Sequence, residues 1–211
     1  DQIRGEAATL PFFSRGALRN PTVVRLPSLA YQKGFGGHFH NDNSLTVFRD
    51  IPGIIVACPS NGPDAARMLR TCVHLAREQG RVVMFVEPIA LYYTRELHAT
   101  GDGLWTSTYQ PEAQDEDIQF QQPGIYGDGT DLCILTYGNG TYLSRQAEQE
   151  LRTQHGMHVR IVDLRWLVPL PEQEILQAIS SCQRILIVDE GRRSGSISEA
   201  LCTLLLEAGI T

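Results

Sequence analysis

The sequence of 211 residues has no long apolar run. None approaches the roughly 20 apolar residues that a helix needs to span a bilayer. The first ten residues, DQIRGEAATL, lack the apolar centre of a secretory signal peptide. We therefore expect no membrane partner and a cytoplasmic location.

An excess of basic charge is missing as well. The 18 lysines and arginines are outnumbered by 24 aspartates and glutamates, which gives a formal net charge of -6. The basic residues form no stripe along the sequence. Because proteins that bind nucleic acid gather its phosphates with clustered Lys and Arg side chains, we expect no nucleic-acid partner.

Cysteine pairs of the CxxC type are also absent. The five cysteines are scattered, odd in number and set within apolar runs or apolar helix faces: Cys58, Cys72, Cys133, Cys182 and Cys202. Zinc sites and disulfide frameworks need closely spaced or paired cysteines. This pattern predicts reduced thiols that pack in the core.

What the chain does contain is an alternation of apolar segments. With 42% hydrophobic residues it can bury one large core or two modest cores. Short β-branched stretches at 22–27, 53–59 and 81–88 each stop at a proline, which is typical of buried strands in a parallel sheet. Between the last two, residues 60–80 have helical spacing, with a cap at Ser60 or Asn61 and a stop at Gly80.

The alternation is interrupted and then resumes. Residues 98–129 are rich in Gly, Gln, Asp, Glu and Pro and predict a linker with a surface arm. After them, strands at 131–138, 158–165 and 184–191 alternate with helices at 141–156, 171–181 and 196–209. The prediction is an α/β fold of two parallel-sheet, three-layer units, with a first domain over 1–97 and a second over 130–211.

The first unit shows three strands, few for a sheet that usually has about five or six. The last predicted helix runs to the final residues. We therefore expect this chain to be a piece of a longer polypeptide, or one whose sheets are completed elsewhere.

The segment GGHFHNDNS, residues 36–44, is the most polar candidate for a site. On an extended chain His38 and His40 point to the same side and can reach one zinc ion, with Asp42 continuing the alternation. No third firm ligand is identifiable in the sequence. A catalytic or substrate-contacting histidine needs fewer partners, and a polar loop without chemistry remains an alternative.

Three glycine-rich turns are weaker candidates. In thiamine-diphosphate enzymes a GDG triplet followed some two dozen residues later by asparagine holds the diphosphate and Mg²⁺. Here the triplets 101–103 and 127–129 lack that asparagine, since Asn139 follows Gly129 by ten residues. We interpret both as tight turns. The turn 138–140 can present amides to a phosphate, but it lacks a full phosphate-binding pattern, and a plain connection is favoured.

The order of several motifs resembles a known family. These motifs are VVRLP at 23–27, GG at 36–37, HNDNSLTVFRDIPGIIVACPSNGPDAARML at 40–69, VEP at 86–88, VDLRWLVPLPEQEIL at 162–176 and VDEG at 188–191. In this order and spacing the chain resembles the β subunit, or β half, of the E1 component of 2-oxo acid dehydrogenase complexes, which are transketolase-like thiamine-diphosphate enzymes.

The resemblance implies a fold and a site. The first unit would be the later part of a pyrimidine-binding domain, and the second a transketolase C-terminal domain. His40 falls on the family's active-site histidine, implied to contact the 2-oxo acid or its cofactor adduct and to manage a proton during acyl transfer to a lipoyl arm. Asn41 and Asp42 replace the family's serine and glutamine. His38 has no firm counterpart and is a candidate substrate contact in the same pocket.

The resemblance also implies cofactors and partners. Thiamine diphosphate and Mg²⁺ would be held mainly by residues outside this chain, so we assign no cofactor-binding residue or metal ligand within it. The partners would be an E1 α subunit or α half, the E2 lipoyl acyltransferase and a small 2-oxo acid, within an oligomer. In a eukaryote the expected location becomes the mitochondrial matrix.

Two other functions stay open. One is another transketolase-like enzyme, such as a transketolase or a deoxyxylulose-phosphate synthase. The other is a noncatalytic module that docks a partner subunit. Whether the 2-oxo acid is pyruvate, 2-oxoglutarate or a branched-chain acid also remains open.

Overall fold

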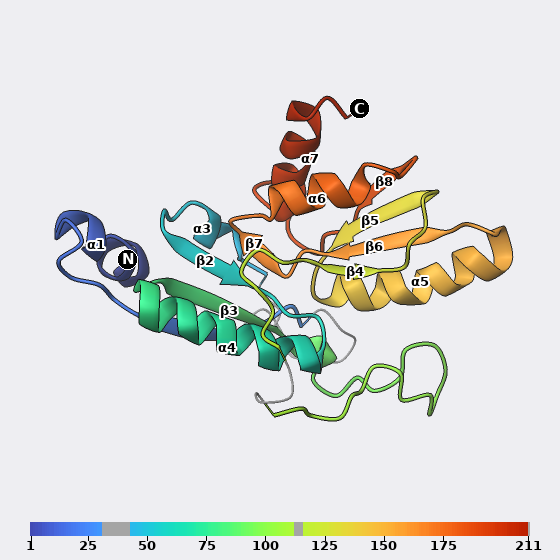
Figure 1. Ribbon diagram of the computed structural model, residues 1–211, viewed down its shortest axis with the longest axis horizontal. Helices are drawn as coiled ribbons and strands as arrows, with labels where there is room; N and C mark the ends of the chain where they lie inside the picture. The colour runs from blue at the N-terminus through green and yellow to red at the C-terminus, as the bar shows by residue number, and fades with distance from the viewer. Residues whose placement is uncertain (31–42, 112–115, 211) are drawn as a thin grey trace.

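The computed structural model describes residues 1–30, 43–111 and 116–210 and contains two sheets that lie side by side (Figure 1). The predicted site residues His38 and His40, with their neighbours Asn41 and Asp42, lie outside the described residues. What the structure places are the two ends of the segment that contains them, Ala30 and Asn43.

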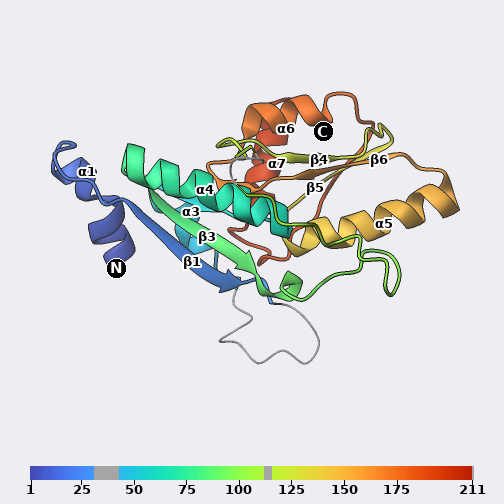
Figure 2. The same cartoon turned by 60° about the horizontal axis from the view of Figure 1, so that its bottom comes forward.

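The first sheet has the order β1-β3-β2-β7. Strands β1 (Thr22–Ser28), β3 (Val82–Pro88) and β2 (Ile54–Ala57) are parallel, whereas β7 (Trp166–Val168) pairs antiparallel with β2. Helix α4 (Gly62–Gln79) connects β2 to β3 and packs on the sheet (Figure 2). It begins as predicted, because the Asn61 side chain accepts a hydrogen bond from the Asp64 amide, and it ends at Gly80 in the left-handed conformation.

The second sheet has the order β4-β6-β5-β8. Strands β6 (Val159–Asp163), β5 (Leu132–Thr136) and β8 (Ile185–Ile187) are parallel, and β4 (Gly124–Tyr126) is antiparallel to β6. The helices of this unit are α5 (Asn139–His155), α6 (Glu172–Ile179) and α7 (Ile197–Glu207), which lie around the sheet (Figure 1).

Short elements complete the described chain. A π-helix η1 (Ile3–Ala8) and helix α1 (Leu10–Phe13) precede β1, helix α3 (Thr46–Arg49) precedes β2, and a 3-10 helix η2 (Ile89–Leu91) follows β3. None of the helices in the described residues is both long enough and apolar enough to cross a membrane.

The α/β class is confirmed, but the prediction of wholly parallel sheets needs correction. Each sheet carries one antiparallel strand, β7 in the first and β4 in the second. Strand β7 begins three residues after β6 ends, because Arg165 has a left-handed backbone (φ 56°) that turns the chain toward the first sheet. Strand β4 falls inside residues 98–129, where we expected a linker, and the domain division itself stays a prediction.

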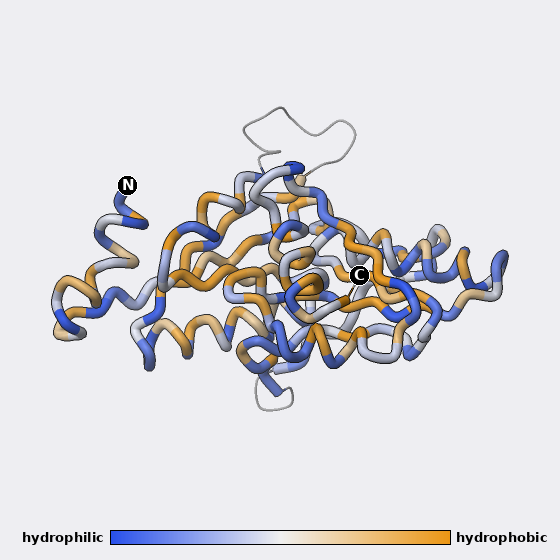
Figure 3. The backbone as a smooth tube through the Cα atoms, turned by 90° about the horizontal axis from the view of Figure 1, so that it is seen from above, coloured by the Kyte–Doolittle hydropathy of each residue, from blue (hydrophilic) through white to orange (hydrophobic). Residues whose placement is uncertain are grey.

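The two sheets share one core. A single cluster joins Val56 and Met84 of the first sheet to Leu135 and Val162 of the second. The apolar stretches run through the interior of the molecule (Figure 3). Of the cysteines, Cys58, Cys72 and Cys133 are buried as predicted, whereas Cys182 is half-buried and Cys202 is exposed on α7, so the prediction is wrong for Cys202.

Candidate functional site

Leu29 and Asn43, which flank residues 31–42, both contact the second unit. Leu29 is fully buried, has a left-handed backbone (φ 51°), and its carbonyl accepts a hydrogen bond of 2.9 Å from Asn139 Nδ2. Asn43 Nδ2 donates to the backbone carbonyl of Glu190 at 3.1 Å. The second unit therefore binds a residue on each side of the segment that contains the predicted histidines.

Asn139 and Glu190 also contact each other. Asn139 Nδ2 lies 3.1 and 3.0 Å from the two carboxylate oxygens of Glu190. Burial raises the pKa of Glu190, the nearby Asp189 raises it further, and the Asn139 hydrogen bond lowers it. The turn 138–140 is thus more than a plain connection, since its asparagine joins the two units.

Asp189 fixes the loop that carries Glu190. Its carboxylate accepts hydrogen bonds from the Tyr137 hydroxyl at 2.7 Å and from the amides of Gly191 and Ser198 at 2.7 and 2.8 Å. Burial alone would raise the pKa of Asp189, but these donors lower it below its ordinary value. An ionised Asp189 with three donors holds the VDEG turn in one conformation.

A buried ion pair forms a second contact between the units. Arg165 binds Asp64 through Nε at 2.8 Å and Nη2 at 2.7 Å, and the two side chains are 11% and 5% exposed. The carbonyl of Arg165 also accepts a hydrogen bond of 2.7 Å from the Cys58 amide. Nearby, Ser60 donates a hydrogen bond of 3.1 Å to Thr141, so further polar contacts lie along the boundary between the two units.

Asp163 is a buried acid beside this boundary between the two units. It is 0% exposed, and neither carboxylate oxygen has a hydrogen-bond partner in the described part of the chain. The hydroxyl of Ser60 donates its hydrogen bond to Thr141. Burial raises the pKa of Asp163 to about 7, although Ser60 and Arg165 act in the opposite direction. The folded state therefore favours the protonated acid.

We expect Asp163 to make stability dependent on pH. Because its pKa is higher in the folded than in the unfolded chain, its contribution is present at pH 4 and is lost as the pH rises through 7. Asparagine is nearly isosteric with aspartate and does not ionise, so Asp163→Asn removes this loss. At pH 8 the free energy of unfolding of the variant should exceed that of the parent by about 2 kcal/mol. Denaturant unfolding at pH 5 and pH 8 measures the difference, and equal differences at both values would contradict the expectation.

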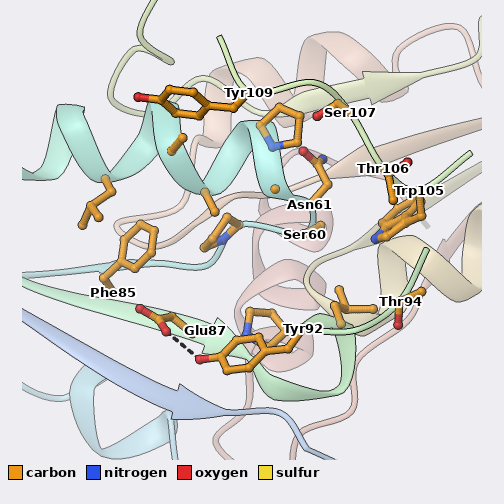
Figure 4. A pocket seen from close by; sticks show the side chains of 18 of the residues that line it. Ser60, Asn61, Phe85, Glu87, Tyr92, Thr94, Trp105, Thr106, Ser107 and Tyr109 are labelled. Atoms are coloured by element: carbon orange, nitrogen blue, oxygen red, sulfur yellow. Dashed lines mark hydrogen bonds between the residues drawn. The ribbon is translucent and has the colours of Figure 1, made fainter. Parts of the chain in front are cut away.

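A cavity of about 970 Å³ opens beside the carboxyl ends of β2 and β3 (Figure 4). At one side Glu87 accepts a hydrogen bond of 2.6 Å from the Tyr92 hydroxyl and forms a two-contact ion pair with Arg25. Burial would raise the pKa of Glu87, but Arg25 and Tyr92 lower it. Its carboxylate is therefore ionised and occupied by protein donors.

The remaining walls of the cavity combine aromatic and apolar side chains with several serines, threonines and side-chain amides. Phe85 lies on the sheet side, while Trp105 and Tyr109 come from the segment that follows β3 (Figure 4). Asn61 lies near the start of α4, and its side chain is bound to Asp64 and to the Tyr126 hydroxyl. Such a lining accommodates an apolar or planar group with a polar edge.

The GDG triplet at 101–103 lies in a turn, as predicted, whereas residues 127–129 form an irregular connection between β4 and β5. Gly101, Gly103 and Gly127 have φ values of 82°, 60° and 71°, which favour glycine. The Asp102 carboxylate accepts hydrogen bonds from four backbone amides, those of residues 97, 98, 99 and 104. These bonds hold the pKa of Asp102 well below its ordinary value.

Asp102 is therefore not available to a metal. Within residues 1–30, 43–111 and 116–210, no group of three or more His, Cys, Asp or Glu side chains is placed to hold one. The described residues do not fit a diphosphate and Mg²⁺ site.

Some functional contacts were not predicted from the sequence. Asp64, Arg165 and Glu190 stand in motifs that we quoted for the family resemblance, and Asn139 stands in the turn 138–140, but their pairings were not foreseen. The only available signal was their position at strand ends and at the start of helices, where parallel sheets usually gather polar side chains.

This arrangement, with a mixed α/β sheet joined to a second unit through polar residues at its strand ends, resembles the fold of transketolase-like proteins. Residues 125–211 match the family described as transketolase, C-terminal domain. The split-gene transketolase, solved as an inactive β4 tetramer, is 18% identical, with a TM-score of 0.62 over 88% of this chain and 52% of that one. The 2-oxoglutarate:ferredoxin oxidoreductase of Magnetococcus marinus is 13% identical, with a TM-score of 0.51 over 73% and 37% of the two chains.

The curated relatives that match almost the whole chain are named as beta subunits of dehydrogenases. The chain is 26% identical over 208 residues to the 2-oxoisovalerate dehydrogenase subunit beta of Bacillus subtilis (strain 168) and 29% identical over 218 residues to that of Pseudomonas aeruginosa. It is 26% identical over 217 residues to the pyruvate dehydrogenase E1 component subunit beta of Staphylococcus aureus (strain Mu50). These matches cover 98%, 98% and 100% of this chain but 58%, 57% and 59% of the relatives.

These matches support the resemblance of the chain to transketolase-like E1 β subunits. The chain spans less than two thirds of the length of the relatives it matches.

Proposed function

We propose that the chain is the β part of a thiamine-diphosphate-dependent 2-oxo acid dehydrogenase. Together with an α part, the enzyme would decarboxylate a 2-oxo acid and transfer the acyl group to lipoyl-lysine of an E2 acyltransferase. The proposal rests on relatives named as β subunits of 2-oxoisovalerate and pyruvate dehydrogenases, which match almost the whole chain. The proposed location is the cytoplasm, or the mitochondrial matrix in a eukaryote.

The observation that supports a catalytic role is the attachment of the residues on either side of 31–42. Leu29 and Asn43 are bound by Asn139 and Glu190 of the second unit, beside the carboxyl ends of the strands of the first sheet. In open α/β sheets ligands bind outside these strand ends. A segment whose flanking residues are bound there is a suitable carrier for an active-site histidine.

We assign the catalytic role in this segment to His40. A neutral imidazole can take up and release a proton near pH 7, and in this proposal His40 supplies that proton when the acyl group passes to the lipoyl arm. His38 is assigned to the same pocket as a substrate contact. The neighbours Asn41 and Asp42, which differ from the family's serine and glutamine, bear on the choice of 2-oxo acid.

The cofactor of the proposed reaction would be held by residues outside this chain. Thiamine diphosphate with Mg²⁺ needs oxygen ligands for the metal and donors for the diphosphate. In the described residues Asp102 is occupied by four amides, and no group of three or more His, Cys, Asp or Glu side chains is placed to hold a metal, which supports this assignment. The contribution assigned to this chain is the orientation of the substrate and the movement of a proton.

Two alternatives make different demands. A sugar-phosphate transketolase needs a cluster of cations for the phosphate, whereas Arg25, at the edge of the large cavity, is paired with Glu87. A noncatalytic docking module needs no cofactor. Calorimetry of thiamine diphosphate and Mg²⁺ with the full-length protein and its α part, followed by assays with pyruvate, 2-oxoglutarate, branched-chain 2-oxo acids and ketose phosphates, separates the three functions.

By itself the 211-residue chain should be inactive. We expect no decarboxylation of any 2-oxo acid and no calorimetric binding of thiamine diphosphate, because the described residues do not fit the diphosphate and Mg²⁺ site. Adding the α part and the remainder of the β part should restore both. Release of carbon dioxide by the purified chain alone would contradict this expectation.

A further inference from the structure

The cavity of about 970 Å³ beside the carboxyl ends of β2 and β3 has no role in the proposed function. Aromatic side chains line it, those of Phe85, Tyr92, Trp105 and Tyr109, and it is here called the aromatic cavity. We propose that the aromatic cavity is a binding site for a planar aromatic carboxamide, whose carbonyl accepts a hydrogen bond from Trp105. The proposal does not depend on the proposed function, and every residue that lines this cavity belongs to the described part of the chain.

The aromatic side chains of the cavity differ in exposure. Phe85, on β3, is 2% exposed, whereas Tyr92 and Tyr109 are 51% and 72% exposed and come from the segment that follows β3 (Figure 4). Large exposed aromatic groups that border a cavity are typical of a surface that a ligand covers. The volume of the cavity falls within the range of small-molecule sites, about 300–1,000 Å³. A planar ligand of two fused rings therefore has room in it.

Trp105 gives the cavity a hydrogen-bond donor that is not used. Its indole Nε1 is buried, and no hydrogen-bond partner for it is found in the part of the chain that the structure describes. Trp105 lines the cavity, and its indole nitrogen lies on the side of the ring that faces the cavity (Figure 4). A buried N–H group without an acceptor costs free energy. The carbonyl oxygen of a ligand in the cavity would remove this cost.

The ring of Trp105 is fixed by its neighbours. It packs edge-on against Tyr142 of α5, with 5.1 Å between the ring centroids. The Tyr142 hydroxyl donates to the carbonyl of Glu96 at 3.0 Å and accepts a hydrogen bond of 3.0 Å from Gln146 Nε2. The Trp105 amide donates to the carbonyl of Arg95 at 2.9 Å. The indole N–H therefore has a fixed direction before a ligand binds, which favours binding.

Two threonines of the lining indicate why the ligand is an amide. The hydroxyls of Thr94 and Thr106 donate to the carbonyls of Ala90 at 3.1 Å and Gly103 at 2.7 Å. Their hydrogens are therefore used, and their oxygens can act as acceptors. A primary amide offers both groups that this lining can bind, a carbonyl for Trp105 and an N–H for a threonine oxygen.

The charges of the lining favour a neutral ligand. Arg25 and Glu87 are the charged residues that line the cavity, and they form an ion pair with each other. Glu87 also accepts the hydrogen bond from Tyr92. A carboxylate or an ammonium group would lose water in this cavity without gaining an opposite charge of its own, which is costly. A neutral carboxamide does not carry this cost.

The experiment is a calorimetric titration of the full-length protein with its α part. The probe is 2-naphthamide, and the comparison probes are 2-naphthoate, which is charged, and naphthalene, which has no amide. Trp105→Phe keeps an aromatic ring beside Tyr142 but removes the N–H, and Ala66→Trp fills the cavity from α4. Tyr93→Phe is the matched control, because Tyr93 is 92% exposed and does not line the cavity. Circular dichroism shows whether each variant is folded.

We expect 2-naphthamide to bind the parent protein more tightly than either comparison probe. Trp105→Phe should weaken its binding about 10-fold, because one hydrogen bond is lost, and should leave the binding of naphthalene unchanged. Ala66→Trp should abolish binding of both probes, and Tyr93→Phe should change neither.

Three results would overturn the proposal. If 2-naphthamide does not bind the parent protein, another part of the assembly fills the cavity. If Trp105→Phe weakens all three probes equally, the indole N–H does not bind the amide. If folded Ala66→Trp keeps its affinity, the probe binds elsewhere, and this test decides even where Trp105→Phe does not fold. Absence of 2-oxo acid decarboxylation would refute the proposed function and leave this binding result as it stands.

Discussion

Replacement of Arg165 by alanine should lower the free energy of unfolding by about 3–5 kcal/mol. The change leaves the Asp64 carboxylate, whose side chain is 5% exposed, without its cationic partner. It also removes the two contacts that the nitrogens of Arg165, which follows β6 of the second unit, make with Asp64. Most of the lost stability is the cost of burying the Asp64 charge without a partner. In the intact protein, the attraction between the two charges offsets little more than the cost of removing both from water.

Urea unfolding of the folded protein measures this loss. Arg152→Ala is the control, because Arg152 pairs with Glu148 on the surface of α5 at 3.3 Å and is 57% exposed. That exposed pair should contribute less than about 1 kcal/mol. A second variant, Asp64→Asn with Arg165→Met, should recover part of the loss, since it removes both charges. If Arg165→Ala proved as mild as Arg152→Ala, the ion pair would not join the two units.

Replacement of His40 by alanine should lower acyl transfer to lipoamide by about 100- to 10,000-fold in the complete enzyme. The reason is the loss of the group assigned to supply a proton near neutral pH. Binding of thiamine diphosphate should change much less, because the cofactor's diphosphate and metal ligands are assigned to residues outside this chain. Stopped-flow acylation of a lipoyl domain and calorimetry of the cofactor measure the two quantities.

The matched control is His155→Ala, since His155 is exposed in the last turn of α5. It should leave both acyl transfer and cofactor binding at the level of the parent enzyme. Full activity of His40→Ala with its α part would end the assignment. A loss of cofactor binding equal to the loss of acyl transfer would indicate that His40 acts in the cofactor site instead.

Local patterns determined much of this protein. The spacing of apolar residues predicted α4 with its cap at Asn61 and its end at Gly80, because helix periodicity and termini depend on nearby residues. The turn at 101–103 was predictable for the same reason, since glycine has no side chain that disfavours the positive φ values of Gly101 and Gly103. The order of motifs also predicted the resemblance to E1 β subunits, which the relatives support.

Only the tertiary structure decided how these parts meet. Strand β7 lies in the sheet of the first unit, although its three residues follow β6 of the second. Arg165 contacts Asp64, which lies 101 positions earlier in the sequence, and Asn139 contacts Leu29, which lies 110 positions earlier. Such partners depend on the packing of whole sheets, and no local propensity encodes the distance between them. The sequence by itself therefore predicted the family resemblance and the candidate histidines, whereas the packing of the two units decided which residues bind Leu29 and Asn43 on either side of them.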